Sequence, residues 1–145
     1  MTVASICSRE VDIVASLETV RTAAQRMLQR NVGTLVVVDR ERRPVGIVTD
    51  RDLVLRVLAE GRDGSAVPIS EVLTTMPRTI QADASIEDCL AAMRRAGVRR
   101  LPVVDGKGIL TGLVSIDDIL GRLASEARLI GGILEQEGPK VLQVG

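Results

Sequence analysis

Apolar and polar positions along this chain follow a pattern that recurs after 66 residues. Residues 12–58 can be laid over residues 78–124 without a gap. Within 32–52, eight of 21 positions are identical to their counterparts, where chance gives roughly two, and self-similarity at a fixed period indicates duplication. The identical pairs are Val32/Val98, Leu35/Leu101, Val37/Val103, Val38/Val104, Asp39/Asp105, Gly46/Gly112, Val48/Val114 and Asp52/Asp118. The chain is therefore two copies of one unit.

The first helix of each copy is marked by its apolar spacing and by its ends. Ser85 is a candidate N-cap in the second copy, with Asp88 three residues later. The helices should end at Asn31 and at the equivalent Gly97, because both residue types tolerate the left-handed conformation that closes a helix. The apolar face consists of Val20, Ala23, Ala24 and Met27 in the first copy and of Ile86, Cys89, Leu90 and Met93 in the second.

Strands and a second helix complete each copy. Short apolar segments open the copies, with Val3 and Ile6 in the first and Ile69 and Val72 in the second. Alternating and β-branched runs then predict strands, and apolar spacing predicts the last helix. The expected strands are 12–15, 34–39 and 45–49 with a helix at 53–59, then 78–81, 100–104 and 109–115 with a helix at 119–124. The prediction is an α/β (α+β) fold of two tandem β-α-β-β-α units with pseudo-two-fold symmetry.

The repeat also predicts the domain boundaries. The first domain is placed at 1–63 and the second at 67–124, with a linker at 64–66 in a stretch rich in Gly and Ser. Residues 125–145 form an extension beyond the repeat.

An apolar helical face is suggested in this extension, but two glycines interrupt it and Gly138-Pro139 ends it. The residues of that face are Leu129, Ile130, Ile133 and Leu134, and the interrupting glycines are Gly131 and Gly132. We expect a terminal helix that caps the core, with a partner-binding motif as the alternative.

Composition argues against several classes of function. The 19 basic and 19 acidic residues balance, and Phe, Tyr and Trp are absent. Nucleic-acid binding is not expected, because it uses net positive charge and stacking side chains. His, the commonest general base and metal ligand, is also absent. With no nucleophile beside a base and no ligand cluster of metal spacing, we expect neither catalytic residues nor a metal site, and so no enzyme.

The cysteines and the apolar runs bear on location. Cys7 and Cys89 form no C-x-x-C pair, and Cys89 falls on a helix face where it should be a small buried hydrophobe. No signal peptide precedes the first repeat, and no apolar run is long enough to span a bilayer. We therefore expect a cytoplasmic protein with no membrane partner.

The motif that carries chemistry lies where a strand leads into the second helix of each copy. It reads GIVTDRDL at 46–53 and GLVSIDDI at 112–119. The hydroxyl residue and the acid three positions later, Thr49/Asp52 and Ser115/Asp118, form capping boxes, which are a structural device. A helix start of this kind also presents unpaired N–H groups that suit a phosphate. Both interpretations remain open on the residues alone.

These motifs resemble a tandem pair of cystathionine β-synthase (CBS) domains, a Bateman module of the stand-alone bacterial type. GVRRLPVVD at 97–105 and Met76-Pro77 at the entry to the second copy add to the resemblance, which covers residues 1 to about 124. It implies a regulatory module that binds AMP, ADP, ATP or S-adenosylmethionine, with or without magnesium, in clefts between the repeats. It also implies a homodimer that forms a flat disc through the helices.

The resemblance assigns the binding residues. It places Asp52 and Asp118 on the ribose hydroxyls, and Thr49 and Ser115 on phosphate or ribose. The remaining implied residues are Thr34 and Arg100 at cleft-facing strand starts, and Val14 and Ile80 beside adenine.

The two clefts should differ in charge. Arg51 precedes the ribose Asp in the first copy, whereas Asp117 occupies that position in the second and would repel a phosphate unless Arg99 and Arg100 compensate. We expect the cleft that uses Asp52 to bind the more highly charged nucleotide.

The leading hypothesis is an energy or metabolite sensor that needs no cofactor and acts on an unidentified regulated protein. The alternative is a structural or protein-interaction module without a physiological nucleotide. Both copies retain the hydroxyl and the Asp, which favours binding.

Overall fold

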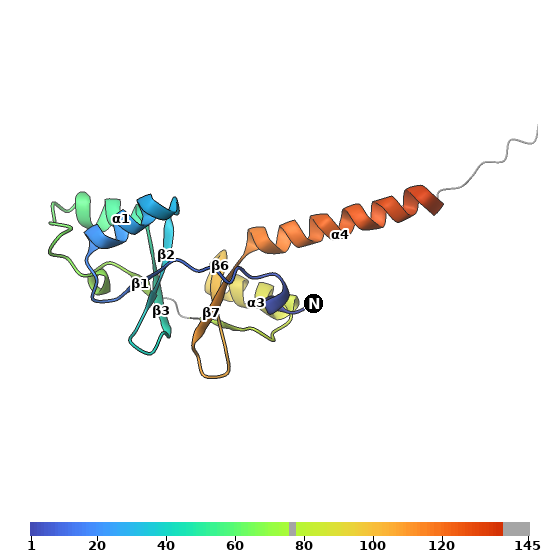
Figure 1. The fold of residues 1–145 in the computed structure, drawn as a ribbon, viewed down its shortest axis with the longest axis horizontal. Helices are drawn as coiled ribbons and strands as arrows, with labels where there is room; N and C mark the ends of the chain where they lie inside the picture. Colours follow the sequence, from blue (N-terminus) through green and yellow to red (C-terminus); the bar gives the residue numbers. More distant parts are fainter. Residues whose placement is uncertain (76–77, 138–145) are drawn as a thin grey trace, which may run out of the picture.

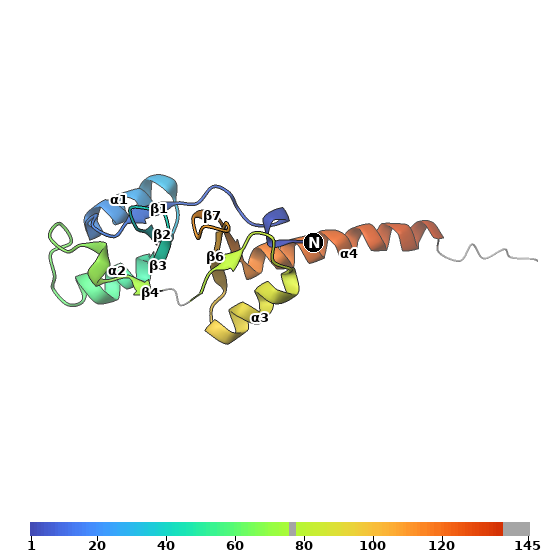
Figure 2. The same cartoon turned by 90° about the horizontal axis from the view of Figure 1, so that it is seen from below.

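The computed structural model describes residues 1–75 and 78–137 of the 145-residue chain. Two small sheets stand side by side, each with a helix packed on it, and a long last helix leaves the body (Figures 1 and 2). The arrangement confirms the α+β class and the tandem repeat. The strands are β1 (Ile13–Ala15), β2 (Thr34–Val38), β3 (Pro44–Thr49), β4 (Thr74–Thr75), β5 (Ile80–Gln81), β6 (Arg100–Val104) and β7 (Leu110–Ser115), and the helices are α1 (Val20–Arg30), α2 (Asp50–Leu53), α3 (Ile86–Ala96) and α4 (Ile116–Glu137).

The two hairpins have the same register. Thr34 pairs with Thr49 in β2–β3, and the equivalent Arg100 pairs with Ser115 in β6–β7. Each ladder shifts register once, before its last pair, and each hairpin is extended by a parallel strand, β1 beside β2 and β5 beside β6. A slip of one residue would turn the buried side chains outward, so the shared register keeps the same apolar positions in both cores.

The opening segment of each copy packs against the other copy. Val3 is fully buried in the second core, and its N–H donates to the carbonyl of Ala84 at 2.9 Å. Ile69 is fully buried in the first core, and its N–H donates to the carbonyl of Glu18 at 2.8 Å. Positions 3 and 69 are equivalent, as are 84 and 18, so the exchange is reciprocal and the copies are interleaved.

Each copy still has a core of its own between its sheet and its first helix. Leu35 and the equivalent Leu101 are fully buried at the centres of the two cores. Cys89 is buried in the second core, as predicted, and this burial raises the pKa of its thiol. The predicted helix ends are also confirmed, since Asn31 and Gly97 both adopt the left-handed conformation.

The second helices start earlier than predicted and differ from each other. α2 begins at Asp50 and α4 at Ile116, directly after the capping hydroxyl of each motif. In the first copy α2 continues as a π-helical turn at Val54–Leu58. In the second copy α4 runs unbroken through Gly131 and Gly132 to Glu137.

The prediction of a terminal helix that caps the core is wrong. The outer part of α4 points away from both sheets (Figures 1 and 2), and Leu129 is 70% exposed. The predicted helix end at Gly138-Pro139 and the motif Met76-Pro77 lie outside the described residues. Within the described ranges, no helix has the length and apolar character that crossing a membrane requires.

Candidate ligand-binding cleft

Two equivalent capping boxes begin the second helices. Thr49 Oγ1 accepts a hydrogen bond from the Asp52 N–H at 3.1 Å, and Asp52 Oδ2 accepts one from the Thr49 N–H at 3.0 Å. Ser115 and Asp118 repeat these bonds at 3.1 and 2.9 Å. The capping role is therefore confirmed for both pairs. In the described structure the box engages only Oδ2 of each carboxylate, which leaves Oδ1 for other partners.

An open cleft lies in front of the first capping box, where the two copies meet. Its volume is about 670 Å³, within the range of sites for small organic ligands. The first copy supplies the turn into α2 and the start of β2, and the second copy supplies the start of β6. The lining residues are Gly33, Thr34, Ile47, Thr49, Asp50, Arg51, Asp52, Thr74, Val98, Arg99 and Arg100.

Three arginines give this cleft a basic lining. Arg51 comes from α2, whereas Arg99 and Arg100 come from the second copy. Arg100 Nη1 donates to Thr34 Oγ1 at 2.6 Å, and this bond links equivalent strand starts across the copies. Arg99 lies 4.0 Å from Asp117, but both side chains are more than three-quarters exposed, so solvent screens this pair.

Arg56 connects the capping box to the segment that enters the cleft. Its Nη1 donates to the carbonyls of Val72 and Leu73 at 2.9 and 3.1 Å. Its Nε lies 3.9 Å from Asp52 Oδ1, the oxygen that the box does not engage. The residues that follow Leu73 form β4, which pairs with β3 and brings Thr74 to the cleft wall. Arg56 therefore lies between Asp52 and the β4 segment, and its hydrogen bonds go to that segment.

The equivalent surroundings in the second copy differ in charge and contacts. Ile116 and Asp117 replace the Asp-Arg pair that follows Thr49. Arg122 stands at the position of Arg56, but its Nε lies 3.4 Å from Glu126 Oε1, on its own helix. The two capping boxes are alike, and the groups around them are not.

The structure brings together six of the ten predicted ligand-binding residues. Thr34, Thr49, Arg51, Asp52, Arg99 and Arg100 line the cleft described above. Ser115 and Asp118 lie at the second capping box, outside that lining. Val14 is fully buried in the first core, so its side chain forms no wall of the cleft, and Ile80 is partly buried against the second core. Contact of Val14 or Ile80 with an adenine stays a prediction that this open cleft does not support.

Sequence reasoning missed five residues of the lining, namely Gly33, Ile47, Asp50, Thr74 and Val98. A Cβ at Gly33 would come 2.9 Å from Asp50 Oδ2, so the glycine lets this carboxylate close over the strand start. Comparison of the copies could have found Asp50, since Ile116 replaces it in the second copy. Thr74 gave no such signal, because β4 joins the sheet of the other copy.

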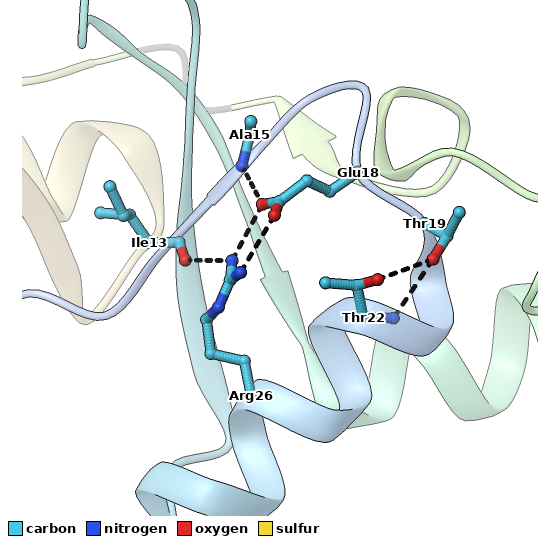
Figure 3. Close-up of polar contacts among 6 residues, drawn as sticks. All are labelled: Ile13, Ala15, Glu18, Thr19, Thr22 and Arg26. Carbon is cyan, nitrogen blue, oxygen red and sulfur yellow. Dashed lines mark hydrogen bonds and ion pairs between the residues drawn. The ribbon is translucent and has the colours of Figure 1, made fainter.

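A second charged group lies along the edge of β1, away from this cleft (Figure 3). Arg26 donates to both carboxylate oxygens of Glu18 at 2.9 and 3.0 Å and to the carbonyl of Ile13 at 2.9 Å. Glu18 also accepts from the Ala15 N–H at 2.8 Å. Hydrogen bonds from Arg26 hold the pKa of Glu18 below its usual range. The pair thus satisfies backbone groups of an edge strand, a structural task.

Comparison with known proteins agrees with the duplicated architecture. The family model "CBS domain" matches twice, at residues 3–59 and 69–125. An uncharacterized protein of Methanopyrus kandleri is 32% identical over 120 residues, which cover 83% of this chain and 61% of that protein. This chain thus spans less than two thirds of that relative. Hypoxic response protein 1 of Mycobacterium tuberculosis is 33% identical over 126 residues, which cover 87% of this chain and 87% of that protein.

Solved structures share the fold as well. The crystal structure of Hypoxic Response Protein I with two coordinated zinc ions has a TM-score of 0.74 at 33% identity, covering 83% of this chain and 97% of that one. A CBS domain protein from Pyrobaculum aerophilum complexed with AMP has a TM-score of 0.71 at 28% identity, covering 86% and 99%.

The zinc of the first structure has no evident counterpart here. This sequence has no His, and residues 1–75 and 78–137 contain no group of three or more Cys, Asp or Glu side chains that could hold a metal ion. The family match, in contrast, covers most of the chain and coincides with the interleaved repeats. The chain belongs to the CBS domain family and contains two CBS domains in tandem.

Proposed function

We propose that this CBS pair is a regulatory module that binds an adenosine-containing nucleotide in the cleft between its copies. The observation that carries the proposal is the meeting of Asp52 and Thr49 with Arg51, Arg99 and Arg100 around one open cleft. An acid that hydrogen-bonds hydroxyls, beside guanidinium groups that pair with phosphate, suits a ribose phosphate. The AMP bound by the Pyrobaculum aerophilum protein supports the same class of ligand.

In this proposal the two ends of the nucleotide contact different copies. Asp52 Oδ1 accepts hydrogen bonds from the ribose hydroxyls, while Oδ2 stays in the capping box. Arg99 and Arg100 approach the phosphates from the second copy, and Arg51 approaches them from the first. The base, for which the chain has no aromatic partner, is held by aliphatic side chains such as Ile47. A ligand held this way stabilises one relative placement of the copies.

Regulation then follows from a shift in population. A ligand that binds one relative placement of the two copies more tightly than another increases the population of that placement. A partner protein can respond to this change. The module itself performs no chemistry. The bond between Arg100 and Thr34 lies in the cleft and joins the copies, so bound phosphate would compete for Arg100.

We also propose that two chains pair through the helices of the body to form a disc. A groove of about 350 Å³ between α1 and the π-helical turn is lined by apolar side chains, among them Val54 and Leu58. Leu58 is 74% exposed and Leu28, on α1, is 82% exposed. Such a contiguous apolar face is typical of an association surface.

A thermal-shift series on nucleotide-stripped protein tests the binding function. AMP, ADP, ATP, S-adenosylmethionine, NAD and GTP are added, each with and without magnesium. A ligand that binds only the folded state raises the melting temperature. We expect a rise with an adenosine ligand in the wild type and none in the Asp52→Ala/Asp118→Ala variant. No rise with any ligand at millimolar concentration would instead favour a protein-interaction module with no nucleotide.

A further inference from the structure

The outer part of α4 carries an apolar seam that is exposed in the described structure. Its members, Leu123, Ala127, Ile130 and Leu134, recur at alternating spacings of four and three residues. Leu123 is 52% exposed and Leu134 is 64% exposed. This alternation averages 3.5 residues, the repeat of helices that pack side by side over several turns.

The helix that bears the seam needs a packing partner. Gly131 and Gly132 lie inside it, and glycine weakens a helix interior because the unfolded chain has more freedom to lose. The part of α4 beyond the repeat is short enough to be marginal as an isolated helix in water, since that limit is about 12–15 residues, and helices in proteins owe most of their stability to packing of an apolar face. Both views of the fold show α4 pointing away from the sheets, so the body does not supply that packing (Figures 1 and 2).

We propose that this seam pairs with the α4 seam of a second copy of the chain, in antiparallel orientation. This pairing is distinct from the disc contact proposed at α1 and the π-helical turn, and it does not depend on a nucleotide. In an antiparallel pair centred between positions 127 and 130, Ala127 of each chain packs against Ile130 of the other. A small side chain then faces a large one. The same alignment sets Leu123 against Leu134 of the other chain. A parallel pair would set Ala127 against its own copy and leave a gap in the seam.

The charges of α4 agree with a partner of the same sequence. Arg122 and Arg128 balance Glu126 and Glu135 along the described side chains of the outer helix. Arg122 and Glu126 already form an ion pair within the helix at 3.4 Å. With Glu137 counted, the helix from Arg122 onward carries one net negative charge, so repulsion between two such helices is weak. Antiparallel packing also sets their helix dipoles favourably.

Sedimentation velocity of the full chain over a concentration series tests the pairing. Leu123→Glu/Ile130→Glu places two charges in the seam, and we expect the dissociation constant of the assembly to rise at least about tenfold. Leu129→Glu/Gln136→Glu is the matched control, since it places the same charges at the same spacing on the opposite helix face. Circular dichroism checks that both variants fold. Equal behaviour of the two variants, or a wild type that stays monomeric at every concentration, overturns the proposal.

Disulfide cross-linking tests the orientation. Leu123→Cys and Leu134→Cys proteins are oxidised separately and as a mixture, and mass spectrometry locates each bond. Antiparallel pairing predicts a disulfide between position 123 of one chain and position 134 of the other, formed only in the mixture. A bond between two positions 123 would overturn the antiparallel orientation. Absence of any cross-link at either position would overturn the pairing itself.

Discussion

The two copies of the CBS unit agree in backbone and disagree in charge. Their hairpins share register, their first helices end in the same left-handed conformation, and their capping boxes match within 0.1 Å in each hydrogen bond. Around the boxes, Arg51 and Arg56 in the first copy are replaced by Asp117 and by Arg122, which pairs elsewhere. The duplication thus conserves what folds the unit, while the surroundings of each cleft are free to diverge.

The largest effects are expected from substitutions in the two cores, which test the architecture that the copies share. Leu35→Ala and Leu101→Ala remove equivalent, fully buried side chains, and each should lower the free energy of unfolding by about 2–5 kcal/mol. We expect similar losses and a single transition in both variants, because the opening segments interleave the copies. Urea unfolding followed by circular dichroism measures both. Two separate transitions, with only the mutated copy unfolding early, would contradict the interleaving.

Substitution of the two acids proposed to bind ribose, Asp52 and Asp118, tests the difference in charge between the copies. Asp52→Ala should weaken ATP binding by about tenfold or more, since it removes a charged hydrogen-bond acceptor from the cleft with three arginines. Asp118→Ala should weaken ATP less than AMP, because Asp117 stands beside that box. Calorimetric titration of both variants with both nucleotides measures the difference. Equal losses for the two variants with AMP and with ATP would contradict the unequal clefts.

The sequence could predict the features of the two copies that depend on residues close together along the chain. The period of 66 residues, the three strands of each repeated unit and the capping boxes depend on neighbours along the chain, and these were predicted. The exchange of Val3 and Ile69 was not, since equivalent residues give the same apolar signal whichever core they enter. Six of the ten predicted residues lie in one lining, but the sequence did not indicate that Arg99 and Arg100 lie in the same lining as Asp52. Thr74 depends on a strand added from a distant segment.

The path of α4 escaped prediction for a different reason. Two adjacent glycines normally end a helix or weaken it, so the pattern favoured a break at Gly131. The structure continues through it to Glu137. Which helix faces are covered depends on what lies beside them in space, and the described fold leaves the seam on α4 exposed.

The smallest expected effect concerns an ion pair that only the first copy has. Glu18 and Arg26 tie together the edge of β1 (Figure 3), whereas Ala84 and Ala92 occupy the equivalent positions in the second copy. Glu18→Gln keeps the size of the side chain and removes its charge. Because both partners are about one third exposed, we expect a loss of less than about 1 kcal/mol in the free energy of unfolding near neutral pH.

The pH dependence of that loss tests its electrostatic origin. Folding lowers the pKa of Glu18 from its ordinary value of 4.5, so its contribution is complete above that pH. As the pH falls through the lower folded pKa, the carboxylate is protonated in both states and the contribution disappears. Urea unfolding of wild type and Glu18→Gln should therefore differ near pH 7 and converge at acidic pH, below the folded pKa of Glu18. A difference that stays constant between these pH values would mean that side-chain packing, and not the ion pair with Arg26, distinguishes the first copy at this edge.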